Sequence, residues 1–137
     1  MKLLTREWVK KAEGDFACAQ RELRARKAPS YDASCFHAQQ CAEKYLKALL
    51  QEQGTPFGKT HDLAILADLL IPIVPSLKPL RDDLKKLTAY AVEFRYPGAS
   101  ADKTIASEAC RMSERIRGVA RLQLGVRGRS SPRSLPC

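Results

Sequence analysis

The chain has 137 residues, 45% of them hydrophobic, and a formal net charge of +9, so its length suits one domain with one core. No stretch approaches the ~18 uninterrupted apolar residues of a membrane span, because Asp68, Pro72 and Pro75 interrupt the most apolar segment, residues 63–75. The N-terminus also lacks the apolar centre of a signal peptide. By elimination, we expect a cytoplasmic protein.

The positive charge is concentrated near the C-terminus. Residues 111–137 hold seven arginines and one acidic residue, a net of +6, which leaves +3 for residues 1–110. From Gly125 onward the sequence has no periodicity. We therefore expect a helical domain over residues 1–124 and a basic disordered tail over residues 125–137. An acidic or nucleic-acid partner would exploit such a tail, but the tail alone does not require one.

The first predicted helix covers about residues 6–27, with Thr5 as its N-cap. Its apolar side recurs at helical spacing and consists of Trp8, Ala12, Phe16, Ala19 and Leu23. Asp15 is the acidic residue nearest to that side. The short connection that follows, residues 27–30, predicts antiparallel packing against the next helix.

The second predicted helix, residues 31–53, has the pattern of a central helix. Ser30 or Asp32 can cap its start, and Gly54 is placed to end it. Its apolar side consists of Tyr31, Cys35, Ala38, Ala42, Tyr45 and Leu49, and the opposite side carries His37, Gln40, Lys44, Lys47 and Gln51. This polar stripe is either an ordinary solvated face or, if a second subunit packs over it, the lining of a basic groove.

Three further helices complete the prediction. A short helix over residues 61–70 begins at Thr60 or His61, and a longer one over about residues 77–94 has Ser76 as its cap. The last covers about residues 103–124, and its apolar set is Ile105, Ala109, Met112, Ile116, Val119 and Leu122. The sequence has no β-strand alternation and no internal repeat. It predicts an all-α fold, an up-and-down bundle of about five helices.

The cysteines indicate neither a disulfide framework nor a metal site. Their number is odd and no CxxC pair is present; they are Cys18, Cys35, Cys41, Cys110 and Cys137. We expect them to be reduced and mostly buried, as small apolar side chains. No metal ligand set or metal cofactor is predicted.

Two segments carry side chains suited to an anionic ligand. At a predicted helix end, Arg95 offers a fork of donors to phosphate and Tyr96 offers a ring to a base; alternatively, the arginine is salt-bridged and the tyrosine packed. At the start of the short helix, Lys59 and His61 lie among backbone N–H groups that favour an anion; alternatively, Thr60 and Asp62 only cap that helix. No phosphate-binding glycine loop and no HExxH motif is present.

The chain resembles the HEPN domain family in four places that follow the order of the family pattern. The matching residues are Trp8, Ala12, Asp15 and Ala19, the run Cys35–Leu50, the run Thr60–Leu63, and Arg95-Tyr96-Pro97 after a helix that contains Tyr90. The resemblance implies a helical bundle that dimerises, presents a groove and associates with nucleotides or RNA. It also implies a small nucleotidyltransferase as a partner, in a toxin–antitoxin-like system.

Some branches of that family are metal-independent ribonucleases that use an arginine and a histidine with four to six residues between them. Here the corresponding positions are Ser100, Ala101 and Asp102, and no later residue is a histidine. A ribonuclease without that histidine lacks its general acid or base. The leading hypothesis is a non-catalytic dimeric module that binds a nucleotide or RNA phosphate. The alternatives are a ribonuclease that uses His61 or His37, and a purely structural dimerisation module.

The candidate ligand-binding residues are therefore Arg95, Tyr96, Lys59, His61, Lys44 and Lys47. The expected ligand is a nucleotide, and no other cofactor is predicted.

Overall fold

The structure, a computed structural model, describes residues 1–126, which form five α-helices and one short 3₁₀ helix. The elements are α1 (Leu3–Arg24), α2 (Tyr31–Gln53), α3 (Leu63–Leu70), η1 (Pro75–Leu80), α4 (Arg81–Glu93) and α5 (Lys103–Leu124). The described part contains no strand, which confirms the predicted all-α bundle. The predicted tail lies outside the described residues except for Gly125 and Val126.

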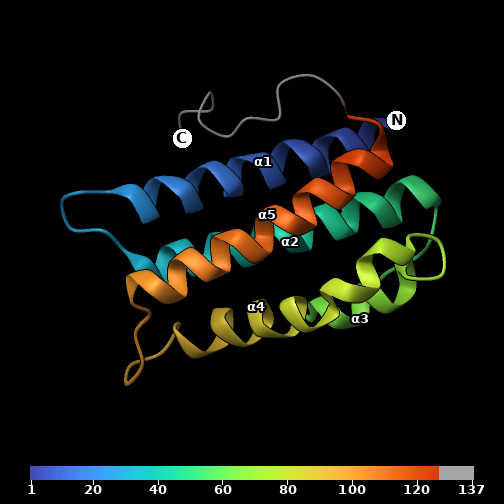
Figure 1. Ribbon diagram of the computed structural model, residues 1–137. Coiled ribbons are helices and arrows are strands. Elements are labelled where there is room, and N and C mark those ends of the chain that lie inside the picture. The colour runs from blue at the N-terminus through green and yellow to red at the C-terminus, as the bar shows by residue number, and fades with distance from the viewer. Residues whose placement is uncertain (127–137) are drawn as a thin grey trace.

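Helix α2 lies at the centre of the bundle (Figure 1). Helix α1 packs along one side of it, α3 and α4 lie along the other, and α5 runs across α2 and also contacts α1 and α4. The short α1–α2 connection makes these two helices antiparallel, as predicted. None of the described helices combines the length and the apolar character needed to cross a bilayer.

The ends of α2 follow from its capping residues. The Ser30 hydroxyl accepts the Ala33 amide at 3.1 Å, and Gly54 ends the helix in the left-handed conformation with φ of 71°, a conformation that glycine adopts without steric cost. Between these ends the helix is buried on nearly all sides. Every residue from Tyr45 to Leu50 is buried, which is the burial expected of a helix with neighbours all round.

Small side chains allow the neighbouring helices to approach α2 closely. Ala12 and Ala19 on α1 and Ala38 and Ala42 on α2 are all at most 1% exposed. Of the cysteines, Cys35, Cys41 and Cys110 are buried and Cys18 is partly buried, whereas Cys137 lies outside the described residues. Burial raises the pKa of the Cys35 and Cys41 thiols to about 12, so both are inert apolar side chains.

The first helix begins and ends earlier than predicted. It starts at Leu3 and ends at Arg24, and Lys2 stands at its N-cap position without a side-chain hydrogen bond. Thr5, the predicted cap, is fully buried inside the first turns. The chain is helical this early because its N-terminus is held against the end of α2, where the Lys2 amide donates to Glu52 at 3.0 Å.

Two more predicted helix starts are wrong. Helix α3 begins at Leu63 rather than at Thr60 or His61, because the Asp62 carboxylate caps it by accepting the Ala64 amide at 3.0 Å. Ser76 does not cap the following helix either. Pro75 and Pro79 impose a 3₁₀ turn over Pro75–Leu80, and the α-helix starts only at Arg81.

One predicted core residue of α5 faces solvent. Leu122 is 84% exposed, whereas Ile116 and Ala120 are fully buried. Leu122 follows Ala120 by two positions, which turns it to the opposite side of a helix. The apolar side of α5 therefore ends at Ala120 and the partly buried Leu124.

A mostly buried ion pair ties three helices together. Glu13 of α1 accepts hydrogen bonds from Nε and Nη2 of Arg117 on α5, at 2.7 and 2.8 Å, and from the Tyr45 hydroxyl of α2. The Arg117 side chain is 5% exposed, and its guanidinium carbon lies 4.5 Å from the centroid of the Phe16 ring. Burial alone would raise the pKa of Glu13, but the hydrogen bonds from Arg117 and Tyr45 outweigh it and lower the pKa.

We expect Glu13→Ala to lower the free energy of unfolding by about 3 kcal/mol, because it leaves the Arg117 charge buried without its carboxylate. The measurement is urea denaturation followed by circular dichroism. The matched control is Asp68→Ala, which removes the carboxylate from an exposed pair with Arg81 and should lower the free energy of unfolding much less, because water screens that pair. Equal losses for the two variants would contradict a special role for Glu13.

Candidate functional site

Charged side chains of the polar stripe predicted on α2 are already paired with carboxylates of the same chain. Asp15 of α1 binds two of its members, the Nδ1 of His37 at 2.8 Å and the Nζ of Lys44 at 2.5 Å. The Asp15 side chain is 11% exposed. Burial would raise the pKa of its carboxyl, but the hydrogen bonds from His37 and Lys44 outweigh burial and lower it. The charge of Lys44 is therefore neutralised by Asp15.

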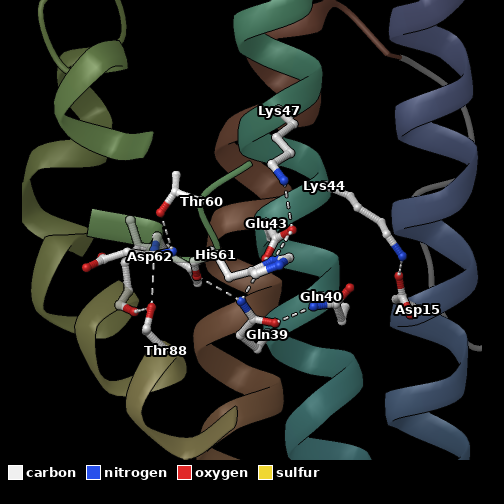
Figure 2. A network of polar contacts seen from close by, with 12 residues as sticks. Asp15, Gln39, Gln40, Glu43, Lys44, Lys47, Thr60, His61, Asp62 and Thr88 are labelled. Atoms are coloured by element: carbon white, nitrogen blue, oxygen red, sulfur yellow. Dashed lines mark hydrogen bonds and ion pairs between the residues drawn. The ribbon is translucent and has the colours of Figure 1, made fainter. Parts of the chain in front are cut away.

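A second carboxylate, Glu43, organises the other half of the stripe (Figure 2). It accepts hydrogen bonds from Lys47 at 3.0 Å, from Gln39 at 3.1 Å and from Nδ1 of His61 at 3.0 Å. Burial of Glu43 raises the pKa of its carboxyl, and these three donors more than compensate, so the pKa is lowered. Gln40 extends the network by donating to Gln39 at 2.7 Å.

Lys47 lies in the interior rather than on a basic surface. Its side chain is 8% exposed, and its ammonium lies beside two neighbouring rings, 5.8 Å from the centroid of Trp8 and 6.0 Å from that of Phe57. With Glu43 as its counter-ion, Lys47 holds α1 and the loop before α3 against α2. A phosphate would have to displace these contacts to reach it.

The segment before α3 supports the capping interpretation of its polar residues. The Thr60 hydroxyl accepts the Asp62 amide at 3.1 Å, and Asp62 caps the helix. The His61 side chain is 76% exposed, although its Nδ1 points at Glu43. Lys59 is exposed. The structure thus brings His61 to the Glu43 network on α2, and it leaves Lys59 in solvent.

Arg95 differs from the lysines of α2 because it has no acidic partner among residues 1–126. It follows the end of α4, is exposed, and stacks its guanidinium over the Phe36 ring of α2, 5.6 Å from the ring centroid. Tyr96, which follows, is 61% exposed. The alternative of a salt-bridged arginine and a packed tyrosine is therefore not what the described residues show.

Arg95 borders a hollow of about 210 Å³ between the start of α2 and the end of α4. Its lining consists of Asp32, Ala33, Phe36, Ala91, Phe94 and Arg95. The Asp32 carboxylate accepts the Ala101 amide at 2.7 Å through Oδ1, which fixes its position beside the start of α5. The hollow therefore combines aromatic walls, one guanidinium and one carboxylate.

Three residues of this hollow were not predicted as site residues from the sequence: Asp32, Phe36 and Phe94. Asp32 was considered only as a helix cap, and Phe36 only within the run that matches the family pattern. The available signal was the four-residue spacing of Asp32 and Phe36, which places both on one face of a helix, together with the position of Phe94 next to Arg95. No pattern in the sequence states that the two segments meet.

The Phe36 ring also connects the two parts of the candidate site. Its centroid lies 5.4 Å from that of His37, with the rings 77° apart. These contacts form a row that leads from Arg95, after the end of α4, through Phe36 and His37 on α2 to Asp15 on α1. A separate, larger hollow of about 700 Å³ lies over α1 and includes Lys44 in its lining. Among the described residues no group of side chains is arranged to hold a metal ion.

Acidification should destabilise the protein as the pH falls through and below about 4. Asp15 has a lowered pKa in the folded state, so its contribution is complete above the unfolded value of ~3.9 and disappears as the folded carboxyl is protonated. We expect Asp15→Asn to be less stable than the wild type at pH 7 and to lose less stability between pH 5 and pH 2.5. The measurement is the free energy of unfolding in urea as a function of pH. Parallel pH profiles for the two proteins would contradict the assignment.

Comparisons with known proteins agree with the helical architecture. The family described as HEPN domain matches residues 5–123. A solved structure of TT1696 from Thermus thermophilus has a TM-score of 0.75 at 24% identity, with 87% of this chain and 97% of that chain covered. Another, ST0689, described as an archaeal HEPN homologue, has a TM-score of 0.68 at 28% identity and covers 90% of this chain and 99% of that chain. No curated protein matches.

The match to the family extends over nearly all of the described helices, from the first turns of α1 to the end of α5. The chain therefore belongs to the HEPN domain family.

Proposed function

We propose that the protein is a non-catalytic HEPN-type module that binds a nucleotide, or a phosphate of RNA, through Arg95 and Tyr96. One observation carries the proposal. Arg95 is an exposed arginine that is held over the ring of Phe36 and has no carboxylate partner among residues 1–126. An arginine in this state keeps its fork of N–H donors available for phosphate oxygens.

The electrostatics of α2 support Arg95 as the main contact. Lys44 and Lys47 are neutralised by Asp15 and Glu43, so a phosphate gains little from either without breaking a pair. In the proposal only Lys44, which is partly exposed, borders the surface beside the ligand, whereas Lys47 lies in the interior. Lys59 and His61, both exposed, contribute at its edge, and the exposed ring of Tyr96 offers a stacking surface to a base.

In this proposal the protein acts as a homodimer with a nucleotidyltransferase-like partner, in a toxin–antitoxin-like system. The outer face of α3 and the turn after it supports a symmetric contact. Ile65, Leu69 and Ile73 are 52%, 42% and 44% exposed, and they recur every four residues along one side. Asp68, the only charged residue of α3, is paired with Arg81 of the same chain. A neutral apolar row can face its own copy without like-charge repulsion.

The rival function is a ribonuclease with a relocated histidine. One observation favours it: His37 and His61 each turn Nδ1 toward a carboxylate, Asp15 or Glu43. A carboxylate at Nδ1 orients an imidazole so that Nε2 can transfer a proton. The test is cleavage of a short RNA by the wild type and by the variant in which both histidines are alanine. Cleavage that disappears in the variant would favour the rival, and we expect the wild type to cleave no RNA.

We expect Arg95→Ala to weaken binding of ATP and of a short RNA at least tenfold, because it removes the charge-assisted contact to phosphate. Titration followed by fluorescence anisotropy measures the effect. The matched control is Arg111→Ala, which removes an exposed arginine of α5 and should change binding less than twofold. Equal or absent binding for the wild type and Arg95→Ala would eliminate the ligand site and leave the structural dimerisation module.

We expect Leu69→Lys to convert the dimer into a monomer, because two new ammonium groups would meet across the two-fold axis. Light scattering coupled to size-exclusion chromatography measures the molar mass. The matched control, Leu122→Lys, introduces the same charge at an exposed leucine of α5 and should remain dimeric. A dimer in which Leu69→Lys has no effect would place the contact elsewhere, and a monomeric wild type would refute dimerisation itself.

A further inference from the structure

We infer that the hollow beside Arg95 selects a guanine base, with Asp32 as the residue that recognises it. This inference rests on the proposed function, since it assigns the base of the nucleotide whose phosphate Arg95 binds. It starts from the size of the hollow. At about 210 Å³ it is smaller than the ~300–1,000 Å³ pockets that hold whole drug-sized ligands. It therefore suits one ring system, with the sugar and phosphate outside.

The walls of the hollow suit a flat aromatic group. Phe36 and Phe94 face it from α2 and the end of α4, and the small Ala33 and Ala91 complete its sides. Aromatic side chains are the surfaces on which unstacked bases are held in single-stranded nucleic acids. Because Arg95 lies over the Phe36 ring at the edge of the same hollow, a base inside would leave its 5′-phosphate near the guanidinium.

Among residues 1–126, Asp32 supplies the only carboxylate of the lining, and this carboxylate determines which base fits. Asp32 uses Oδ1 to accept the Ala101 amide, and no donor among residues 1–126 contacts its Oδ2. An ionised carboxylate only accepts hydrogen bonds, and its two oxygens together offer about four lone pairs. Asp32 can therefore accept further donors without losing its contact to the segment before α5.

Among the common bases, guanine alone places two donors, N1–H and the 2-amino group, side by side on its Watson–Crick edge. Adenine and cytosine place a ring nitrogen acceptor beside their amino group, which would face the carboxylate lone pairs. Uracil offers one N–H between two carbonyl oxygens, which the carboxylate repels. A carboxylate that meets the base edge therefore favours guanine, in the same way that matched donors and acceptors discriminate bases in DNA.

The experiment compares the 5′-monophosphates of guanosine, inosine, adenosine and uridine, together with ribose 5-phosphate, by isothermal titration calorimetry. Inosine monophosphate lacks only the 2-amino group, so it tests that contact on the unaltered protein. We expect guanosine monophosphate to bind about tenfold more tightly than the other nucleotides. In Asp32→Asn we expect this preference to fall below twofold.

The Asp32→Asn substitution is not expected to disturb the fold, because the amide oxygen of the new side chain can still accept the Ala101 amide; circular dichroism checks this. The matched control is Asp102→Asn, which alters the carboxylate that caps α5, outside the lining of the hollow, and should keep the preference for guanosine monophosphate.

Three outcomes would overturn parts of this account. Nucleotides that bind equally well, and only when Arg95 is present, would overturn the guanine inference and leave the phosphate site intact. A preference that persists in Asp32→Asn would overturn the role of Asp32. If neither the nucleotides nor ribose 5-phosphate bind, both the inference and the proposed function fail.

Discussion

The bundle depends on three carboxylates that are paired at the surfaces where α2 meets its neighbours. Glu13 joins α1 to α2 and α5, Asp15 joins α1 to α2, and Glu43 joins α2 to the loop before α3. Charges removed from water are costly unless they are paired and hydrogen-bonded. Each of these carboxylates has at least two donors, and each has a lowered pKa despite its burial. Their pairs therefore allow a helix with polar residues to occupy the centre of the bundle.

The same pairs determine what remains for a ligand. Cations that neutralise internal carboxylates, such as Lys44 and Lys47, belong to the architecture. Arg95 is held instead by an aromatic ring, which orients a guanidinium without neutralising it. Phe36 thus has two roles: it packs at the start of α2, and it holds Arg95, which follows α4, at the surface.

The sequence was sufficient to predict the bounds of a helix when its apolar periodicity is regular and its ends carry strong caps. The bounds of α2 were predicted to the residue because Ser30 and Gly54 flank an unbroken pattern. Thr5 and Ser76 were misassigned because a cap-type residue is common inside helices and turns as well. At Thr5 the contact of Lys2 with Glu52 extended the helix, and at Ser76 two prolines imposed a 3₁₀ turn. The first cause is a contact distant in sequence, which local patterns do not encode, whereas the two prolines were visible in the sequence.

The candidate site was only half predictable for a related reason. Periodicity assigns a residue to a side of its own helix, but it does not state which residues of another helix lie opposite. Lys44 and Lys47 were correctly placed on the polar side of α2, yet their carboxylate partners were not foreseen: Asp15 comes from another helix, and Glu43 was one of several acidic residues nearby. Asp32 was treated as a cap and Phe36 was not assigned to a site, because their relation to Arg95 exists only after α2 and α4 pack together.

The missing histidine after Arg95 separates binding from proton transfer at this site. Phosphate binding requires donors and positive charge, which an arginine supplies at any physiological pH. Cleavage also requires a group that exchanges a proton near neutrality. Arg95 and His37 both contact the Phe36 ring, and the Nδ1 of His37 lies 2.8 Å from Oδ1 of Asp15. Because no histidine follows Arg95 in the sequence, whereas its guanidinium remains available for an anion, we propose a binding module rather than a ribonuclease.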